Sequence, residues 1–233
     1  MAEVSRLTIA VGNSSVRGAA FQGDRLWQTW CTPRAQGLAA VATWQGPWDE
    51  VWLASVVPTV TAAQFPWPQI RTVTLVDIPL QNLYPTLGLD RALVLWGAWQ
   101  HQPLLAIDGG TALTVTAVDA TGRLAGGAIL PGVAAQRQSL QSLGLAVPAT
   151  LTDLARWGDN TPAATGSGVV WGLVGAIAGF VQDWQQRFPH SHGILTGGSG
   201  VLLQPYLLAS GIDFLRWEPD AVFHGLRRLW AGN

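Results

Sequence analysis

Lysine is absent from this chain of 233 residues, and all 13 basic residues are arginine. That absence excludes enzymes whose chemistry needs an amine, namely P-loop nucleotide-binding proteins, protein kinases and enzymes that form a Schiff base. Cysteine is nearly absent as well: the chain has one, Cys31, so it has no internal disulfide. The four histidines are scattered, and no cluster of cysteine and histidine has the spacing of a zinc site.

Charge is scarce too. Charged residues make up 12% of the chain, against roughly 25% in an average soluble protein, and the formal net charge is −1. Without a basic run we expect no nucleic-acid partner. The N-terminal MAEVSR begins no apolar signal-peptide core, and the strictly apolar stretch 169–181 is shorter than the ~20 residues that cross a bilayer. We therefore expect no membrane partner and a cytoplasmic location.

Apolar surface, by contrast, is abundant, with 48% hydrophobic residues and 13 tryptophans. This composition is typical of a folded protein with a sizeable core rather than of a disordered chain. The length suits one large domain or two small ones, at roughly 100–150 residues per domain.

Two segments of the chain resemble each other. IAVGNSSVRGAAFQGDRLW begins at Ile9 and IDGGTALTVTAVDATGRLAGG at Ile107, an offset of 98 residues that holds without a gap. Each segment has the pattern of a strand, a tight glycine turn, a second strand, another turn and a third strand. The repetition indicates duplication into two related halves, residues 1–101 and 102–233.

The rest of the chain alternates between segments with the periodicity of a strand and segments with the periodicity of a helix. The expected further strands are 51–57, 73–78 and 193–196, and the expected helices are 90–101, 162–187 (introduced by Asn160 as N-cap) and 219–230. Strands that alternate with helices indicate an α/β protein, here with two tightly packed halves and a cleft between them.

The glycine-rich turns are candidate phosphate sites, because their backbone N–H groups converge on one point. Gly12-Asn13-Ser14-Ser15 and Gly109-Gly110-Thr111 occupy matching places in the two halves, and TGGSG at 196–200 adds a third such turn. Each turn alone suits an ordinary hairpin equally well. Together they favour nucleotide binding.

The arrangement of two phosphate turns and a third glycine loop resembles the actin–hexokinase–Hsp70 superfamily. More narrowly, the chain resembles type III pantothenate kinases through an ordered set of motifs: VGNSS at 11–15, GLDR at 88–91, DGGTALT at 108–114, GGAILPG at 126–132, DNT at 159–161, TGG at 196–198 and EPDAVFHGLRRLW at 218–230. The resemblance implies two ribonuclease H-like halves of mixed β-sheet, flanked by helices, with the nucleotide in the cleft.

The same resemblance implies an activity and its cofactors. The activity is ATP-dependent phosphorylation of pantothenate to 4′-phosphopantothenate, the first step of coenzyme A biosynthesis. The cofactors are ATP, Mg²⁺ and a monovalent cation, K⁺ or NH₄⁺. A homodimer is implied as well, and the glycine-lined apolar segment 162–182 independently suggests close packing against a second helix or subunit.

Roles carry over to matching residues. Asp90 is similar to the proton acceptor of the family, although an Asp at a helix N-terminus also has a purely structural explanation. Asp108 matches the ligand of the monovalent cation. The residues that match pantothenate contacts are Tyr84, Gly88, Leu89, Asp90, Arg91 and Thr161, where Arg91 suits the substrate carboxylate or a structural ion pair. The residues that match ATP contacts are Ala10, Val11, Gly12, Asn13, Ser14, Ser15, Val16, Arg17 and Thr111.

One position departs from the family pattern. Relatives begin the first turn with Asp, whereas this chain has Ala10, which aligns with Asp108 in the internal repeat. An acidic group at that position would hold Mg²⁺ directly or through water. Its loss leaves two other hypotheses beside the kinase: a non-catalytic nucleotide-binding or regulatory homologue, and a superfamily kinase for another hydroxylated small molecule.

Overall fold

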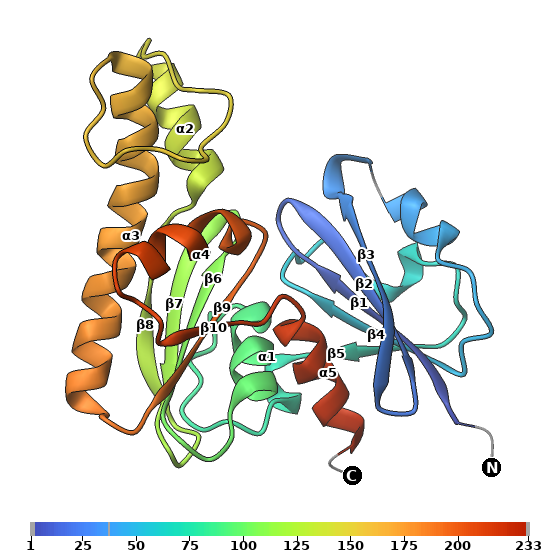
Figure 1. Cartoon of the computed structure of the whole chain (residues 1–233). Coiled ribbons are helices and arrows are strands. Elements are labelled where there is room, and N and C mark those ends of the chain that lie inside the picture. The colour runs from blue at the N-terminus through green and yellow to red at the C-terminus, as the bar shows by residue number, and fades with distance from the viewer. Residues whose placement is uncertain (1–2, 37, 232–233) are drawn as a thin grey trace. The chain divides into compact units, whose positions relative to one another are not determined.

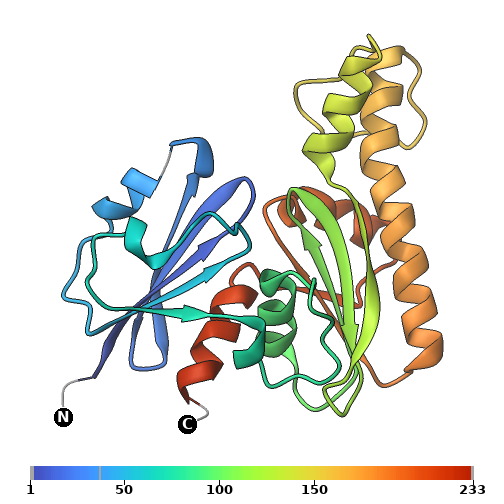
Figure 2. The same ribbon diagram turned by 180° about the vertical axis from the view of Figure 1, so that it is seen from behind.

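The computed structural model describes residues 3–36 and 38–231 and divides into two compact units (Figure 1). The first unit comprises the chain up to Ala98 together with the segment from Asp220 onward, and the second runs from Trp99 to Pro219. The sequence analysis places residues 219–230 in the second half, whereas in the structure the helix they form packs within the first unit. The two units are seen from behind in Figure 2.

The first unit is built on a mixed five-stranded sheet in the order β3-β2-β1-β4-β5. Its strands are β1 (Ser5–Val11), β2 (Ser15–Gln22), β3 (Arg25–Pro33), β4 (Glu50–Ser55) and β5 (Ile70–Val73). β1, β2 and β3 pair antiparallel, while β4 is parallel to both β1 and β5. The helices of this unit are α1 (Leu89–Ala98) and α5 (Ala221–Ala231), with short 3-10 helices at Arg34–Gln36, Leu38–Thr43, Ala62–Gln64 and Leu75–Asp77.

The second unit repeats this plan with the strand order β8-β7-β6-β9-β10 and the same pattern of parallel and antiparallel neighbours. Its strands are β6 (Leu104–Gly109), β7 (Ala112–Val118), β8 (Leu124–Pro131), β9 (His192–Thr196) and β10 (Leu215–Trp217). Its helices are α2 (Val133–Ser142), α3 (Thr161–Arg187) and α4 (Gly200–Ala209). The predicted duplication and the predicted mixed sheets flanked by helices are confirmed.

The offset between the two sheets is not uniform, so the prediction of a gapless repeat is wrong at one strand. The last pair before the first turn is Val11 with Val16, and the equivalent pair in the second unit is Gly109 with Leu113. Four residues close the first turn and three close the second, which shifts β7 against β2 to an offset of 97. The β-bulges agree, because they follow Ala20 and Ala117. The next turn restores the offset to 98 at β3 and β8.

Other boundaries also differ from expectation. The predicted strand 73–78 is wrong beyond residue 73, because Thr74 and Asp77 form a capping box that starts a 3-10 helix instead. The Thr74 backbone N–H donates to Asp77 Oδ2 at 2.8 Å. The predicted helix 90–101 ends at Ala98, and His101 has a left-handed φ of 57° that no helix contains. The helices α2 and α4 were not predicted.

The long helix α3 starts as the sequence indicates. The Asn160 side chain accepts a hydrogen bond from the Ala163 N–H at 3.0 Å, and Pro162 lies in the first turn, where its missing N–H costs nothing. The helix α3 is long and apolar enough to cross a membrane, but half of its most apolar 18-residue stretch is buried within the protein. Its buried face is part of the second unit's core.

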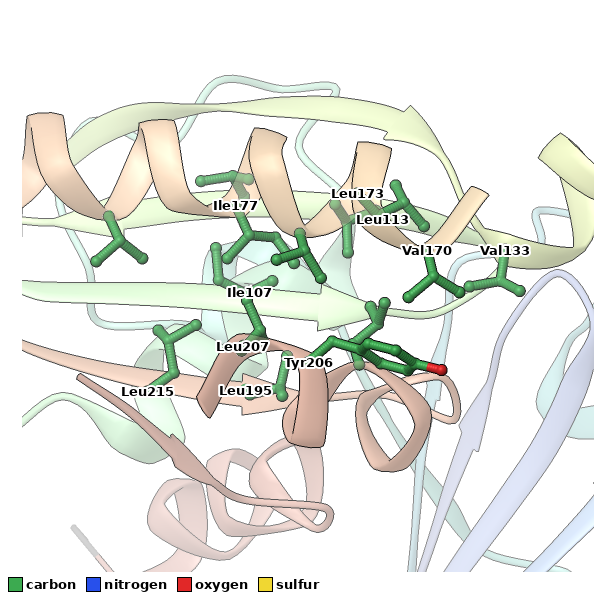
Figure 3. Packing of buried hydrophobic residues seen from close by; sticks show 14 of the residues in the cluster. Ile107, Leu113, Val133, Val170, Leu173, Ile177, Leu195, Tyr206, Leu207 and Leu215 are labelled. Atoms are coloured by element: carbon green, nitrogen blue, oxygen red, sulfur yellow. The ribbon is translucent and has the colours of Figure 1, made fainter. Parts of the chain in front are cut away.

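That core lies between α3 and the sheet (Figure 3). The close-up shows side chains of α3 facing those of β6, β7 and β9, with α4 closing the cluster on its other side; the labelled residues are Ile107, Leu113, Val133, Val170, Leu173, Ile177, Leu195, Tyr206, Leu207 and Leu215. Burial of each large aliphatic side chain stabilises the fold by about 1.5–3 kcal/mol. The Tyr206 hydroxyl donates to the Leu151 carbonyl at 2.8 Å, which ties the loop before α3 to α4.

In the first unit, α5 packs on α1 at very short range. A Cβ on Gly225 would lie 2.1 Å from the Leu93 carbonyl oxygen, so only glycine permits this approach. Arginine–tryptophan stacking adds to the contact: the guanidinium of Arg228 lies 3.8 Å from the ring centroid of Trp96. The C-terminal helix is therefore fixed on the first unit by close backbone contact as well as by side-chain packing.

Candidate functional site

The first candidate site is the turn between β1 and β2, which we call the first hairpin (residues 10–17). The Gly12 N–H donates to the Ser15 carbonyl at 2.9 Å and closes the turn. Arg34 stabilises the tip of the turn through two hydrogen bonds. Its backbone N–H donates to the Ser14 carbonyl, and its Nε donates to the Asn13 carbonyl at 2.7 Å. Asn13 and Ser14 are exposed. The backbone of this turn is thus held in place while its tip faces solvent, as a phosphate-binding turn requires.

The side chains of the first hairpin point in two directions. Val11 and Val16 are buried in the core, so they contribute backbone groups alone to any site. Ala10 and Arg17 are directly paired across the two strands, which places their side chains next to each other on one face of the sheet. Arg17 Nη2 lies 3.3 Å from Asp220 Oδ1. The residue pair at the end of this hairpin therefore includes a cation, Arg17, whereas the equivalent pair in the second unit includes an acid, Asp108.

The second candidate site lies at the start of α1. Asp90 Oδ1 accepts the Arg91 backbone N–H at 2.8 Å, and a Cβ on Gly88 would lie 2.6 Å from that same oxygen. Glycine at position 88 is therefore what lets the carboxylate fold back over the chain. Arg91 is buried, and its Nη1 donates to the Tyr84 hydroxyl at 3.1 Å. Leu89 is buried in the core. The structure thus brings Tyr84, Gly88, Asp90 and Arg91 together.

The ionisation of Asp90 is perturbed. Burial raises the pKa of the Asp90 carboxyl, and this effect exceeds the opposing influence of the Arg91 N–H and the Arg91 charge. A carboxylate with a raised pKa is a better proton acceptor than an ordinary one. This arrangement suits a group that takes a proton from a substrate hydroxyl.

The third candidate site is the turn between β6 and β7, which we call the second hairpin (residues 108–114). Asp108 is the second-to-last residue of β6 and pairs with Thr196 at the end of β9, and Gly197 follows β9 with a φ of 83°. A Cβ on Gly197 would lie 2.1 Å from Asp108 Oδ1. The Ser199 N–H donates to the Gly109 carbonyl at 2.8 Å and holds the glycine loop against the hairpin. A carboxylate provides the oxygen ligands that a hard cation prefers.

The remaining predicted residues lie on the second unit. Thr111 is exposed at the tip of the second hairpin, and its carbonyl accepts the Gly132 N–H at 3.2 Å. A Cβ on Gly132 would lie 2.5 Å from that carbonyl oxygen, so glycine is needed where β8 passes into α2. Thr161 is exposed at the first position of α3, next to the N-cap Asn160.

Within residues 3–36 and 38–231, no group of three or more His, Cys, Asp and Glu side chains is placed to bind a metal ion. Ala10 offers no carboxylate, in contrast to the equivalent Asp108. Any Mg²⁺ at the first hairpin would therefore have no carboxylate ligand from residues 10–17.

The sequence analysis missed Asp220 and Phe223 as neighbours of the first hairpin. They lie about 200 residues away along the chain, and the guanidinium of Arg17 stands 5.0 Å above the Phe223 ring. The segment 218–230 is one of the motifs of the sequence analysis, but nothing in the sequence indicates that it packs against β2. The sequence analysis identified Asp108 and the third glycine turn separately, but it did not predict that Gly197 lies against Asp108.

Comparison with known proteins identifies the family of this chain. The family model for type III pantothenate kinase matches residues 6–183. A type III pantothenate kinase from Synechococcus elongatus is 40% identical over 246 residues, covering 97% of this chain and 96% of the relative. Among solved structures, a conserved Baf family protein from Campylobacter jejuni has a TM-score of 0.71 at 18% identity, covering 97% of this chain and 98% of that one. A ROK hexokinase from Thermus thermophilus has a TM-score of 0.53 at 14% identity, with coverage of 97% and 98%. The two structures share the fold, and the sequence match shows that the chain belongs to the type III pantothenate kinases.

Proposed function

We propose that this protein transfers the γ-phosphoryl group of ATP to the hydroxyl of pantothenate, giving 4′-phosphopantothenate and ADP in the first step of coenzyme A biosynthesis. Family membership over most of the chain supports the reaction. The observation that carries it is Asp90, a partly buried carboxylate with a raised pKa beside Arg91 and Tyr84.

In this reaction the hydroxyl oxygen of pantothenate forms a bond to the γ-phosphorus. The bond between the γ-phosphorus and the bridging oxygen breaks, and that oxygen leaves on ADP. The proton of the hydroxyl passes to Asp90, as phosphoryl transfer requires of a group that orients the nucleophile.

The neighbours of Asp90 suit substrate binding. Arg91 offers a buried guanidinium whose planar fork matches the carboxylate of pantothenate, and Tyr84 orients that guanidinium through its hydroxyl. Gly88 leaves space for the Asp90 carboxylate. We assign Leu89 backbone contacts to the substrate, and Thr161 a hydroxyl contact at the start of α3.

The cofactors divide between the two hairpins. We assign the nucleotide phosphates to residues 10–17 and to Thr111, with Mg²⁺ accompanying the nucleotide. We assign a monovalent cation, K⁺ or NH₄⁺, to Asp108 and the carbonyls around it. Bound there, the cation offsets the negative charge that gathers as phosphoryl transfer proceeds.

We further propose that the protein is a cytoplasmic homodimer without nucleic-acid or membrane partners. The exposed side of α3 carries glycines at 168, 172, 175 and 179, and a Cβ at any of these positions would meet nothing within 4 Å. Such a surface permits a second helix to approach closely. Sedimentation equilibrium at micromolar concentration should give twice 24.8 kDa; a mass of 24.8 kDa would contradict the dimer.

The activity is tested by measuring phosphopantothenate formed from ATP, Mg²⁺, K⁺ and pantothenate. Replacing Asp90 by Asn should lower kcat by about 10²–10⁴-fold, the usual contribution of a general base. Asp213→Asn is the matched control, since Asp213 is exposed on the second unit. No product from the wild-type protein, under conditions where an active relative produces it, would sink the proposed function.

A further inference from the structure

The two hairpins are equivalent in backbone but opposite in charge. In the first, Ala10 pairs with Arg17; in the second, Asp108 pairs with Thr114. Directly opposed residues on antiparallel strands present their side chains on the same face. The first hairpin therefore presents a guanidinium from its second strand on the face where the second hairpin presents a carboxylate from its first strand, and the two suit ligands of opposite charge.

The guanidinium of the first hairpin is held from two sides. Arg17 Nη2 lies 3.3 Å from Asp220 Oδ1, and the side chains keep 29% and 26% of their exposure. The Phe223 ring, itself fully buried, lies 5.0 Å below the guanidinium. An arginine side chain has about 2 kcal/mol of rotamer entropy to lose when it binds. Contacts that fix it beforehand reduce that loss.

The helix that supplies these contacts is itself rigidly placed. Asp220 immediately precedes α5, and the N–H groups of Phe223 and His224 donate to its carbonyl. A Cβ on Gly97 would lie 2.4 Å from the Ala221 carbonyl, so the first turn of α5 lies directly on α1. Asp220 is thus a fixed anchor for the Arg17 side chain.

We propose that Asp220 is a positioning residue that aims Arg17 at the phosphates of the nucleotide, so that the first hairpin binds the polyphosphate through a guanidinium without a protein-held divalent cation. This rests on the proposed function for the identity of the nucleotide. The planar guanidinium donates N–H groups in pairs to phosphate oxygens, while Asp220 accepts from part of its donor set. Ala10 contributes to the same arrangement, because an acidic side chain at position 10 would lie beside Arg17 and compete with phosphate for its guanidinium.

The proposal is tested by titrating ATP into the full-length protein, with EDTA and with Mg²⁺, and by steady-state kinetics. Asp220→Asn keeps a side chain that caps a helix as well as Asp but removes its charge. We expect about fivefold weaker ATP binding in both buffers, in the range of a charge-assisted contact. The KM for ATP should rise by the same factor, while the KM for pantothenate stays unchanged. Asp183→Asn removes the partner of another arginine, Arg187, and should change neither.

Ala10→Asp sharpens the test. It should weaken ATP binding by about fivefold in EDTA and recover with Mg²⁺, because the new carboxylate neutralises Arg17 until a metal occupies it. The proposal is overturned if Asp220→Asn binds ATP like the wild type, or if the wild type binds ATP in Mg²⁺ but not in EDTA. These results are independent of turnover: a wild type that makes no phosphopantothenate, but whose ATP affinity falls in Asp220→Asn, sinks the proposed function and leaves this inference standing.

Discussion

The two units of this protein share a strand order, a strand polarity and even the position of a β-bulge, yet the ends of their first strands differ. The first unit closes with Ala10 beside Arg17 and the second with Asp108 beside Thr114. Backbone register is maintained by a whole ladder of hydrogen bonds, whereas the charge of a turn depends on one or two side chains. A duplicated fold can therefore keep the same backbone structure in both copies while one copy suits an anionic ligand and the other a cationic ligand.

The two cores show the same freedom. The second unit packs mainly aliphatic side chains between α3 and its sheet, whereas in the first unit Trp44 is buried among aliphatic side chains and further tryptophans pack against this cluster. Trp30 and Trp44 are stacked with ring centroids 5.5 Å apart, and Trp44 lies so close to Gly18 that a Cβ there would meet it at 2.4 Å. The same sheet topology thus permits aliphatic or aromatic side chains to pack on it, provided that a small residue such as Gly18 lies below a large ring such as that of Trp44.

Among the effects that test this comparison of the two hairpins, the largest concerns Asp108 in the second hairpin. Asp108→Asn should lower kcat by about a hundredfold and remove the dependence on K⁺, because a neutral amide holds a hard cation poorly. Phosphopantothenate formation in K⁺ and in a bulky organic cation measures both quantities. Retained activation by K⁺ in this variant would mean that the two hairpins do not divide the ions as proposed.

A second effect, on stability, concerns the loop that leans on this hairpin. Gly197→Ala should lower the free energy of unfolding by about 2–4 kcal/mol, since it combines a left-handed φ with a Cβ 2.1 Å from Asp108 Oδ1. Urea denaturation provides the measurement. Gly198→Ala is the matched control, because a Cβ there meets nothing within 4 Å. Equal stability of the two variants would contradict the close contact.

The smallest effect concerns Asp90 in the first unit. Because burial raises its folded-state pKa above the usual 3.8, the protonated carboxyl stabilises the fold below 3.8, and this contribution is lost as pH rises through the raised pKa. Asp90→Asn should therefore have a higher Tm than the wild type at neutral pH, and the difference should shrink in acid. Thermal unfolding at pH 7 and pH 4 tests this; a lower Tm at pH 7 would show that the ionised carboxylate contributes net stability.

Local signals in the sequence identified much of the fold. The repeat at Ile9 and Ile107 predicted both three-stranded units, and Asn160 with Pro162 predicted where α3 begins. Prediction failed where a local signal was outweighed. The apolar run 73–78 favours a strand, but the side chains of Thr74 and Asp77 stabilise a 3-10 helix there. The one-residue shift between β2 and β7 was hidden because two turns of different length cancel in the alignment.

The candidate site divides in the same way. GLDR at 88–91 and the two hairpins were recognisable because the residues of each motif are neighbours in sequence, and their chemistry follows from residue type. The raised pKa of Asp90, the bond from Arg91 to Tyr84 and the pairing of Arg17 with Asp220 depend on burial and on segments that meet only after folding.

The sequence by itself therefore determined the fold class, the duplication and the motifs, because strand periodicity, turn chemistry and capping act over a few residues. The tertiary structure decided the rest. It returned α5 to the first unit, where glycines at 97 and 225 allow backbone contact, and so placed Asp220 at Arg17 across about 200 residues of chain. Such a contact follows from how the elements pack, and no local pattern along the chain encodes it.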